Sequence, residues 1–184
     1  MDDIFINDTL IYVCANDTLS INTTAPTGTT FSWTGPGNFL STVQSPKIYN
    51  VTNTAAGTYI VTASFSGCTT KDSVVVTVKP LPADFSASSN SAVCYYDTAR
   101  LFANTTTSSG VTYSWAGPNS YSSTLKNPYF APALYSDTGS YIVTATLNGC
   151  QVKDTAHLTL KESPGIVTAG NNGPLCEPDT LKLT

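Results

Sequence analysis

The chain has 184 residues, of which 11% are charged, and it carries 8 Lys and Arg against 12 Asp and Glu. This length suits one ordinary domain or two small ones, and hydroxyls and amides must cover much of the surface. With no excess of basic residues to neutralise phosphates, we expect neither nucleic acid nor an anionic membrane surface as a partner. The chain has no apolar run of about 18 residues and no signal-peptide pattern at its start, so we expect no membrane insertion.

Short stretches with period-2 alternation of apolar side chains run along the first part of the chain. The residues expected on one face of each stretch are Leu19 and Ile21, then Phe31 and Trp33, then Tyr59, Val61, Ala63 and Phe65. Gly, Pro and Asn separate these stretches. The pattern predicts one-sided strands and no helices, and such strands must bury their apolar face against a second sheet.

The same elements then return. The stretch SWTGPGNFLST at 32–42 recurs as SWAGPNSYSST at 114–124, so that Trp33 has its counterpart in Trp115. A repeat of this length is a whole domain rather than one turn of a solenoid. We therefore expect an all-β fold of tandem β-sandwiches with about seven strands each.

The predicted domains are residues 1–79 and 83–161, with the N-terminal fragment of a third repeat at 166–184. The stretch Pro-Leu-Pro at 80–82 is the predicted linker, and its prolines restrict how the two domains can be oriented. We expect Trp33 and Trp115 to fill the centres of the two cores. The alternative is an exposed indole on which a sugar stacks.

The cysteines follow the repeat. Cys14 recurs as Cys94, and Cys68 recurs as Cys150. The two cysteines of each unit flank strands that could meet at one end of a sandwich, so we expect one disulfide per domain, Cys14–Cys68 and Cys94–Cys150. Metal ligation is the alternative, but the chain has no Cys-x-x-Cys and a single His. Disulfides indicate a compartment outside the reducing cytosol.

Cys176 lies in the partial third repeat, and we expect its partner to lie beyond Thr184. In each unit, Cys is followed by Asp-Thr, then Trp with Gly-Pro, then Gly-x-Tyr, and finally Gly-Cys. The residues that carry this succession are Cys14, Asp17, Trp33, Gly35, Gly57, Tyr59 and Cys68, and then Cys94, Asp97, Trp115, Gly117, Gly139, Tyr141 and Cys150. The succession resembles the tandem Ig-like repeats of very large bacterial surface proteins exported by the type IX route, including gliding and adhesion proteins.

The resemblance implies an immunoglobulin-like sandwich and an extracellular spacing or adhesion role. The stretch at 137–141 looks like the tyrosine corner of that fold, whereas in the first unit Ala55 stands where the Asp would be. The second cysteine follows the tyrosine by nine positions rather than two, so the antibody-type disulfide is not expected.

We do not expect an enzyme or a bound cofactor. The only glutamates are Glu162 and Glu177, which lie outside the predicted full domains, and no phosphate-binding glycine loop occurs. The leading hypothesis is a stalk or spacer on a cell surface, whose partners are neighbouring repeats of the same array. Two alternatives stay open: a module that binds surface glycans or other proteins through Tyr95, Tyr96 and Tyr121, and a filament subunit completed by strand addition between chains.

Overall fold

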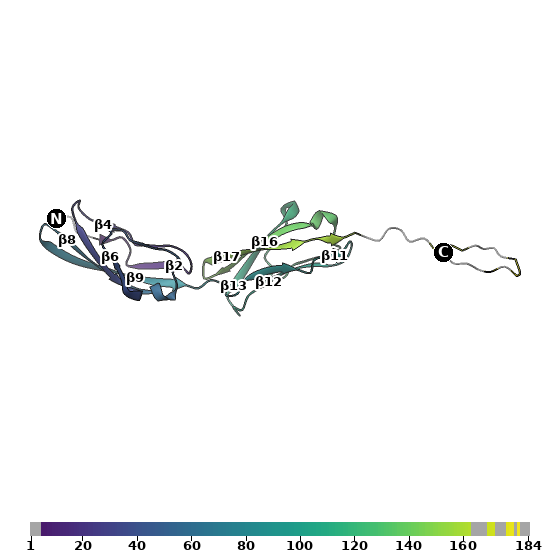
Figure 1. Ribbon diagram of the computed structural model, residues 1–184, viewed down its shortest axis with the longest axis horizontal. Coiled ribbons are helices and arrows are strands. Elements are labelled where there is room, and N and C mark those ends of the chain that lie inside the picture. The colour runs from purple at the N-terminus through teal and green to yellow at the C-terminus, as the bar shows by residue number, and fades with distance from the viewer. Residues whose placement is uncertain (1–4, 163–168, 172–175, 179, 181–184) are drawn as a thin grey trace.

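The computed structural model describes residues 5–162, 169–171, 176–178 and 180. Figure 1 shows two β-sandwiches that follow one another along one long axis. No helix in this part of the chain is long and apolar enough to cross a membrane. Most of the predicted third-repeat fragment, residues 166–184, lies outside the described residues.

The first sandwich contains nine strand segments and two short 3₁₀ turns. They are β1 (Phe5–Ile6), β2 (Leu10–Cys14), β3 (Leu19–Ser20), β4 (Thr23–Thr24), β5 (Thr30–Gly35), η1 (Pro36–Asn38), β6 (Phe39–Ser41), β7 (Lys47–Ile48), η2 (Asn53–Ala55), β8 (Gly57–Phe65) and β9 (Cys68–Lys79). One sheet has the order β2-β9-β8-β5-β6, and the pairs β1-β4 and β3-β7 lie outside it. Strand β2 runs parallel to β9, with Cys14 opposite Lys79.

The second sandwich repeats this plan. Its elements are β10 (Ser86–Ser89), β11 (Val93–Cys94), β12 (Ala99–Asn104), β13 (Val111–Ala116), η3 (Pro118–Ser120), β14 (Ser122–Ser123), β15 (Tyr129–Phe130), η4 (Tyr135–Asp137), β16 (Gly139–Leu147), β17 (Cys150–Leu158) and β18 (Leu160–Lys161). Its main sheet has the order β14-β13-β16-β17, opposite β10-β12-β15. Strand β11 runs parallel to β18, with Cys94 opposite Lys161.

Each sandwich has its own apolar core around a tryptophan. Trp33 and Trp115 are 0% and 1% exposed, and both belong to the core clusters. The indole Nε1 of Trp33 donates to the carbonyl oxygen of Val43 at 3.0 Å, so the buried ring has no unpaired donor. Because Leu19 and Ile21, from the β3–β4 segment, pack in the same cluster as this ring, the core joins the two layers of the sandwich.

The repeated Gly-Pro and Gly-x-Tyr motifs meet in one place. Gly35 lies against the ring of Tyr59, where an added Cβ would come within 2.5 Å of Cδ1. Pro36 in turn lies against Gly57, where a Cβ would be 2.7 Å from the proline Cγ. A glycine is therefore required at each of these positions for contact reasons, and the second sandwich repeats the arrangement.

Both sandwiches have a tyrosine corner. The hydroxyl of Tyr141 donates to the carbonyl oxygen of Asp137 at 2.6 Å, and that of Tyr59 donates to the carbonyl oxygen of Ala55 at 2.9 Å. The acceptor is a backbone oxygen, so Ala55 serves as well as an aspartate. The alanine in the first unit therefore does not affect this bond.

Candidate functional site

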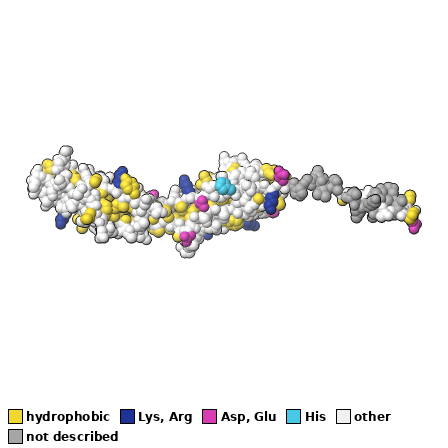
Figure 2. Space-filling model, viewed as in Figure 1, with side chains coloured by type: hydrophobic (Ala, Val, Ile, Leu, Met, Phe, Trp, Pro, Cys, Tyr) yellow, Lys and Arg dark blue, Asp and Glu magenta, His cyan; other side chains and the backbone are white. Residues whose placement is uncertain are grey.

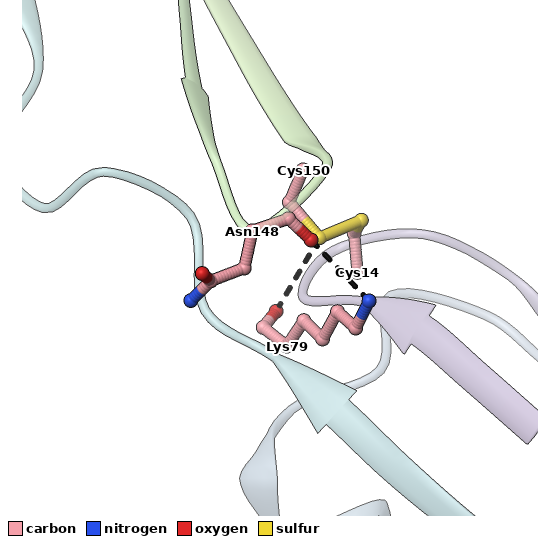
Figure 3. Close-up of a disulfide and its surroundings, with 4 residues drawn as sticks. All are labelled: Cys14, Lys79, Asn148 and Cys150. Carbon is pink, nitrogen blue, oxygen red and sulfur yellow. Dashed lines mark hydrogen bonds between the residues drawn. A yellow bond between two sulfur atoms is a disulfide. The ribbon is translucent and has the colours of Figure 1, made fainter. Parts of the chain in front are cut away.

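The two sandwiches are joined by a disulfide. Cys14, the last residue of β2, bonds to Cys150, the first residue of β17, with their Cα atoms 5.6 Å apart and a sequence separation of 136. Figure 3 shows the bond bridging the end of the first sandwich and the hairpin of the second. A Cα separation of this size is usual for disulfides.

Lys79 lies beside this bond and contacts both sandwiches. Its Nζ donates to the carbonyl oxygen of Asn148 in the second sandwich at 3.3 Å, and it lies 4.6 Å from the ring centroid of Tyr12 in the first. Its own carbonyl oxygen is 4.0 Å from the Sγ of Cys150. A dashed line joins these two residues in Figure 3. A bonded sulfur has no proton to donate, so this last approach is a packing contact.

A tight hairpin presents Cys150 to the first sandwich. Leu147 and Cys150 face each other in the β16–β17 register, and the two turn residues Asn148 and Gly149 have φ values of 52° and 88°. Positive φ at both central positions is the type I′ geometry that suits a two-residue hairpin. Cys150 is 1% exposed and Leu147 is 8% exposed.

The predicted pairing Cys14–Cys68 and Cys94–Cys150, one disulfide within each domain, is wrong. Cys14 lies beside the last residue of β9, and Cys68 is the first residue of that strand. The extended strand separates these two ends by roughly 36 Å, far beyond the reach of a disulfide. The cysteines of one sandwich therefore lie at opposite ends, and the bond forms between sandwiches.

Cys68 and Cys94 are free and exposed. Cys68 follows the turn of Ser66 and Gly67 at the start of β9, in the same hairpin position that Cys150 holds in the second sandwich. Cys94 ends β11 opposite Lys161, in the same position that Cys14 holds opposite Lys79. Because the bonded pair occupies the inner ends, these two thiols occupy the outer ends of the two-domain body.

The three tyrosines proposed as ligand contacts have two different environments. Tyr95 stacks on Tyr135 with a centroid distance of 4.7 Å and meets Tyr96 edge-on at 4.2 Å, and Tyr96 and Tyr135 are 64% and 49% exposed. We call Tyr95, Tyr96 and Tyr135 the tyrosine cluster. A side-chain hydrogen bond with Tyr96 is the main cause that raises the pKa of Tyr95.

Tyr121 is instead part of the packing around the second core. It is half-buried, and its ring lies 4.7 Å from Phe130 and 5.4 Å from Tyr141. Burial, followed by the charges of Asp137 and Tyr121, raises the pKa of Tyr141 to about 12. A side chain packed in this way offers a ligand less of its ring than the tyrosine cluster does.

Two aspartates in equivalent positions of the two sandwiches accept backbone hydrogen bonds. The Oδ2 of Asp72 accepts the backbone N–H of Ile6 at 2.8 Å, and the Oδ2 of Asp154 accepts that of Ala87 at 2.7 Å. Each carboxylate therefore holds the first strand segment of its sandwich against the last long strand. The recurrence of Lys-Asp in both units was the available signal for this role.

The described residues contain no group of three His, Cys, Asp or Glu side chains that could hold a metal ion. The one histidine, His157, is exposed, and its Nδ1 lies 3.0 Å from the Oγ of Ser140. Charged side chains are sparse on the face seen in Figure 2 and are spread over both sandwiches. The most distinctive feature of the described structure is therefore the disulfide junction.

The chain matches no protein-family model. It also matches no curated protein.

The chain aligns with solved structures of multidomain fragments, some of which are named for their Ig domains. The IG1 and IG2 domains of DIP-gamma align at 14% identity and a TM-score of 0.41, over 86% of this chain and 98% of theirs. The four N-terminal Ig domains of Dscam1 isoform 6.9 align at 15% identity and a TM-score of 0.37, over 86% of this chain and 46% of theirs. An I-band fragment of titin aligns at 15% identity and a TM-score of 0.40, over 88% of this chain and 67% of its own.

These scores are low, so the assignment of tandem Ig-like sandwiches rests on the molecule's own features. Those features are the parallel pairing of the second strand with the last, the buried tryptophan of each core and the tyrosine corners.

Proposed function

We propose that the chain is a non-enzymatic, stiff spacer segment of an extracellular repeat array, which holds another part of the protein away from a cell surface. The observation that carries this proposal is the bond between Cys14 and Cys150 at the junction. A disulfide beside the short linker at 80–82 gives the junction two covalent connections instead of one. Two connections remove most of the bending and twisting that a single linker permits.

Other features agree with a spacer outside the cytosol. Disulfides persist in oxidising compartments. A chain with few charges and no excess of basic residues has little electrostatic attraction for nucleic acid or anionic membranes, as a spacer requires. The proposed units are residues 1–79 and 83–161, followed by the start of a third at 166–184. In this proposal the parent is a bacterial surface protein of the type IX kind that the repeat motif resembles.

Small-angle X-ray scattering tests the stiffness. The native chain should give the pair-distance distribution of one extended shape. A Cys14→Ser/Cys150→Ser double variant should give a broader distribution and a smaller radius of gyration, because the linker alone allows bent arrangements. Circular dichroism should be unchanged, since each sandwich keeps its own core.

The matched control is Cys68→Ser/Cys94→Ser, which replaces the same number of cysteines away from the junction and should scatter like the native chain. Equal scattering from the junction variant and the native chain would contradict the spacer proposal.

Binding is a second candidate function, and the tyrosine cluster favours it. The exposed rings of Tyr96 and Tyr135 offer flat faces to sugars or to protein side chains. A glycan array probed with the native chain and with Tyr96→Ala tests this candidate. Saturable binding that the substitution removes would support it, and no binding to any glycan would exclude glycans as the ligand.

A further inference from the structure

We propose that Cys68 and Cys94 are the two halves of a second junction of the same kind, through which this chain bonds head to tail to neighbouring repeats. The partner of Cys68 would be a cysteine in the Cys94 position of a preceding unit. The partner of Cys94 would be a cysteine in the Cys68 position of a following unit. This inference rests on the proposed spacer function and names the partner of that array.

The first support is that each free thiol has a bonded counterpart in this same chain. Cys150 occupies the hairpin position of Cys68 in the second sandwich, and Cys14 occupies the strand-end position of Cys94 in the first. Those two counterparts are bonded to each other. The Cys14–Cys150 bond therefore shows that cysteines in these two positions form a disulfide when two sandwiches meet end to end.

The turn that follows Cys94 has the same backbone hydrogen bond and the same dihedral signature as the turn that follows Cys14. The N–H of Asp17 donates to the carbonyl oxygen of Cys14 at 3.2 Å, and the N–H of Asp97 donates to that of Cys94 at 3.1 Å. The residue before each aspartate has a φ of 68° in both loops, at Asn16 and at Tyr96.

The same loops are also anchored alike to the body of each sandwich. The N–H of Asn16 donates to the carbonyl oxygen of Val51 at 2.8 Å, and that of Tyr96 donates to Ala133 at 2.9 Å. The loop after Cys94 is therefore anchored to its sandwich at the same positions as the loop after Cys14.

The two hairpins differ in what covers them. The Ser66–Gly67 turn has φ values of 49° and 83°, close to those of the hairpin at the junction. Yet Cys68 is exposed and Phe65 is 41% exposed, whereas Cys150 and Leu147 are buried. The alternation of β8 predicts Phe65 on the buried face. At the junction, the first sandwich lies against the hairpin of the second. We infer that a preceding sandwich lies in the same way against the Phe65–Cys68 hairpin of the first.

The bond forms by thiol–disulfide exchange with a small disulfide such as glutathione disulfide. The thiolate of Cys68 attacks one glutathione sulfur and expels one glutathione thiolate, which leaves a mixed disulfide. The Cys94 thiolate of the neighbour then attacks the sulfur of Cys68 and expels the second glutathione. Two protein thiols lose two protons and two electrons, and one glutathione disulfide becomes two molecules of glutathione.

The neighbour can belong to a second copy of this chain or to the same polypeptide, and two arms of one experiment separate these sources. All proteins carry Cys176→Ser, so that only the two thiols in question compete. In the first arm, the Cys68→Ser and Cys94→Ser variants are incubated in glutathione redox buffer, each alone and then mixed. Only the mixture contains one thiol of each kind on separate molecules.

We expect the mixture to give about tenfold more disulfide-linked dimer than either variant alone, because only complementary ends dock and raise the local thiol concentration. Peptide mapping without reduction should find Cys68 joined to Cys94 across the two chains. A Cys68→Ser/Cys94→Ser double variant is the matched control and should remain monomeric.

In the second arm, a further copy of residues 83–161 and a Pro-Leu-Pro linker are added ahead of the full chain. The added copy carries Cys150→Ser and the full chain carries Cys94→Ser, so that again only two thiols compete. The cysteine in the Cys94 position of the added copy should bond to Cys68 within the same molecule, at a rate that does not depend on protein concentration. A mapped bond in either arm supports the inference and identifies the source. If the bond is absent from both arms, the inference is overturned. The spacer proposal still stands in that case if the native chain scatters as one extended shape.

Discussion

Gly35 lies beneath the aromatic ring of Tyr59, so close that any side chain at this position would overlap the ring. We expect Gly35→Ala to destabilise the first sandwich by about 1–3 kcal/mol, because the ring is fixed by the core and cannot move aside. Urea unfolding followed by tryptophan fluorescence measures this. Thr34→Ala, at the exposed neighbouring position, is the control and should have a much smaller effect. An equally small effect of both substitutions would contradict the packing described here.

The stability of the second sandwich should fall as the pH rises from 10 to 12. The pKa of Tyr141 is raised to about 12 from the ordinary value of 10.0, so in this range the folded state binds more protons than the unfolded state. The stabilisation is complete below pH 10 and is lost as the pH approaches 12, with a slope of up to about 1.4 kcal/mol per pH unit. Urea unfolding at several alkaline pH values checks this, and Tyr141→Phe should flatten the slope.

Asp154 should control the attachment of the first strand of the second sandwich. Its carboxylate accepts the backbone N–H of Ala87, so Asp154→Ala should speed hydrogen exchange at that amide by about tenfold or more. Amides in the β16–β17 ladder should keep their protection. The exposed Asp8 offers a matched control, since Asp8→Ala should leave the exchange of Ala87 unchanged. Unaltered exchange at Ala87 in the Asp154 variant would show that the strand is held by other contacts.

Alkylation of the native, unreduced chain should distinguish the cysteines directly. Iodoacetamide should modify Cys68 and Cys94, which are exposed thiols, and should leave Cys14 and Cys150 unmodified until a reductant is added. Mass spectrometry of the digested protein reads out each site. Modification of Cys14 before reduction would contradict the junction.

Much of the fold could be predicted from periodicity alone. The alternation around Tyr59 correctly places Val61 and Ala63 in the first core, although Phe65 at the end of the same strand is 41% exposed. The tryptophans that recur from one unit to the next are buried in both. About seven strands were expected in each sandwich. The structure has nine segments in each, partly because the stretch around Leu19 and Ile21 divides into β3 and β4.

The disulfide pairing could not be predicted in the same way, because it depends on which end of a sandwich each cysteine occupies. The stretch ending in Cys14 runs parallel to β9, and this direction places Cys14 at the far end from Cys68. Alternation reports which face a residue occupies and does not report strand direction. The acceptor of the tyrosine corner could not be predicted either. It is a backbone oxygen, which every residue type has, so the sequence at Ala55 does not indicate it.

The bond between Cys14 and Cys150 determines which part of the chain carries tension when its two ends are pulled apart. The load passes directly from one cysteine to the other across a sequence separation of 136, so the stretch between them, which includes both tryptophans, is shielded from the pull. At about 3.5 Å per extended residue, the bond holds back roughly 480 Å of chain. While the bond is intact, the stretch between the two cysteines cannot lengthen under tension. After chemical reduction, the same stretch can unfold and extend.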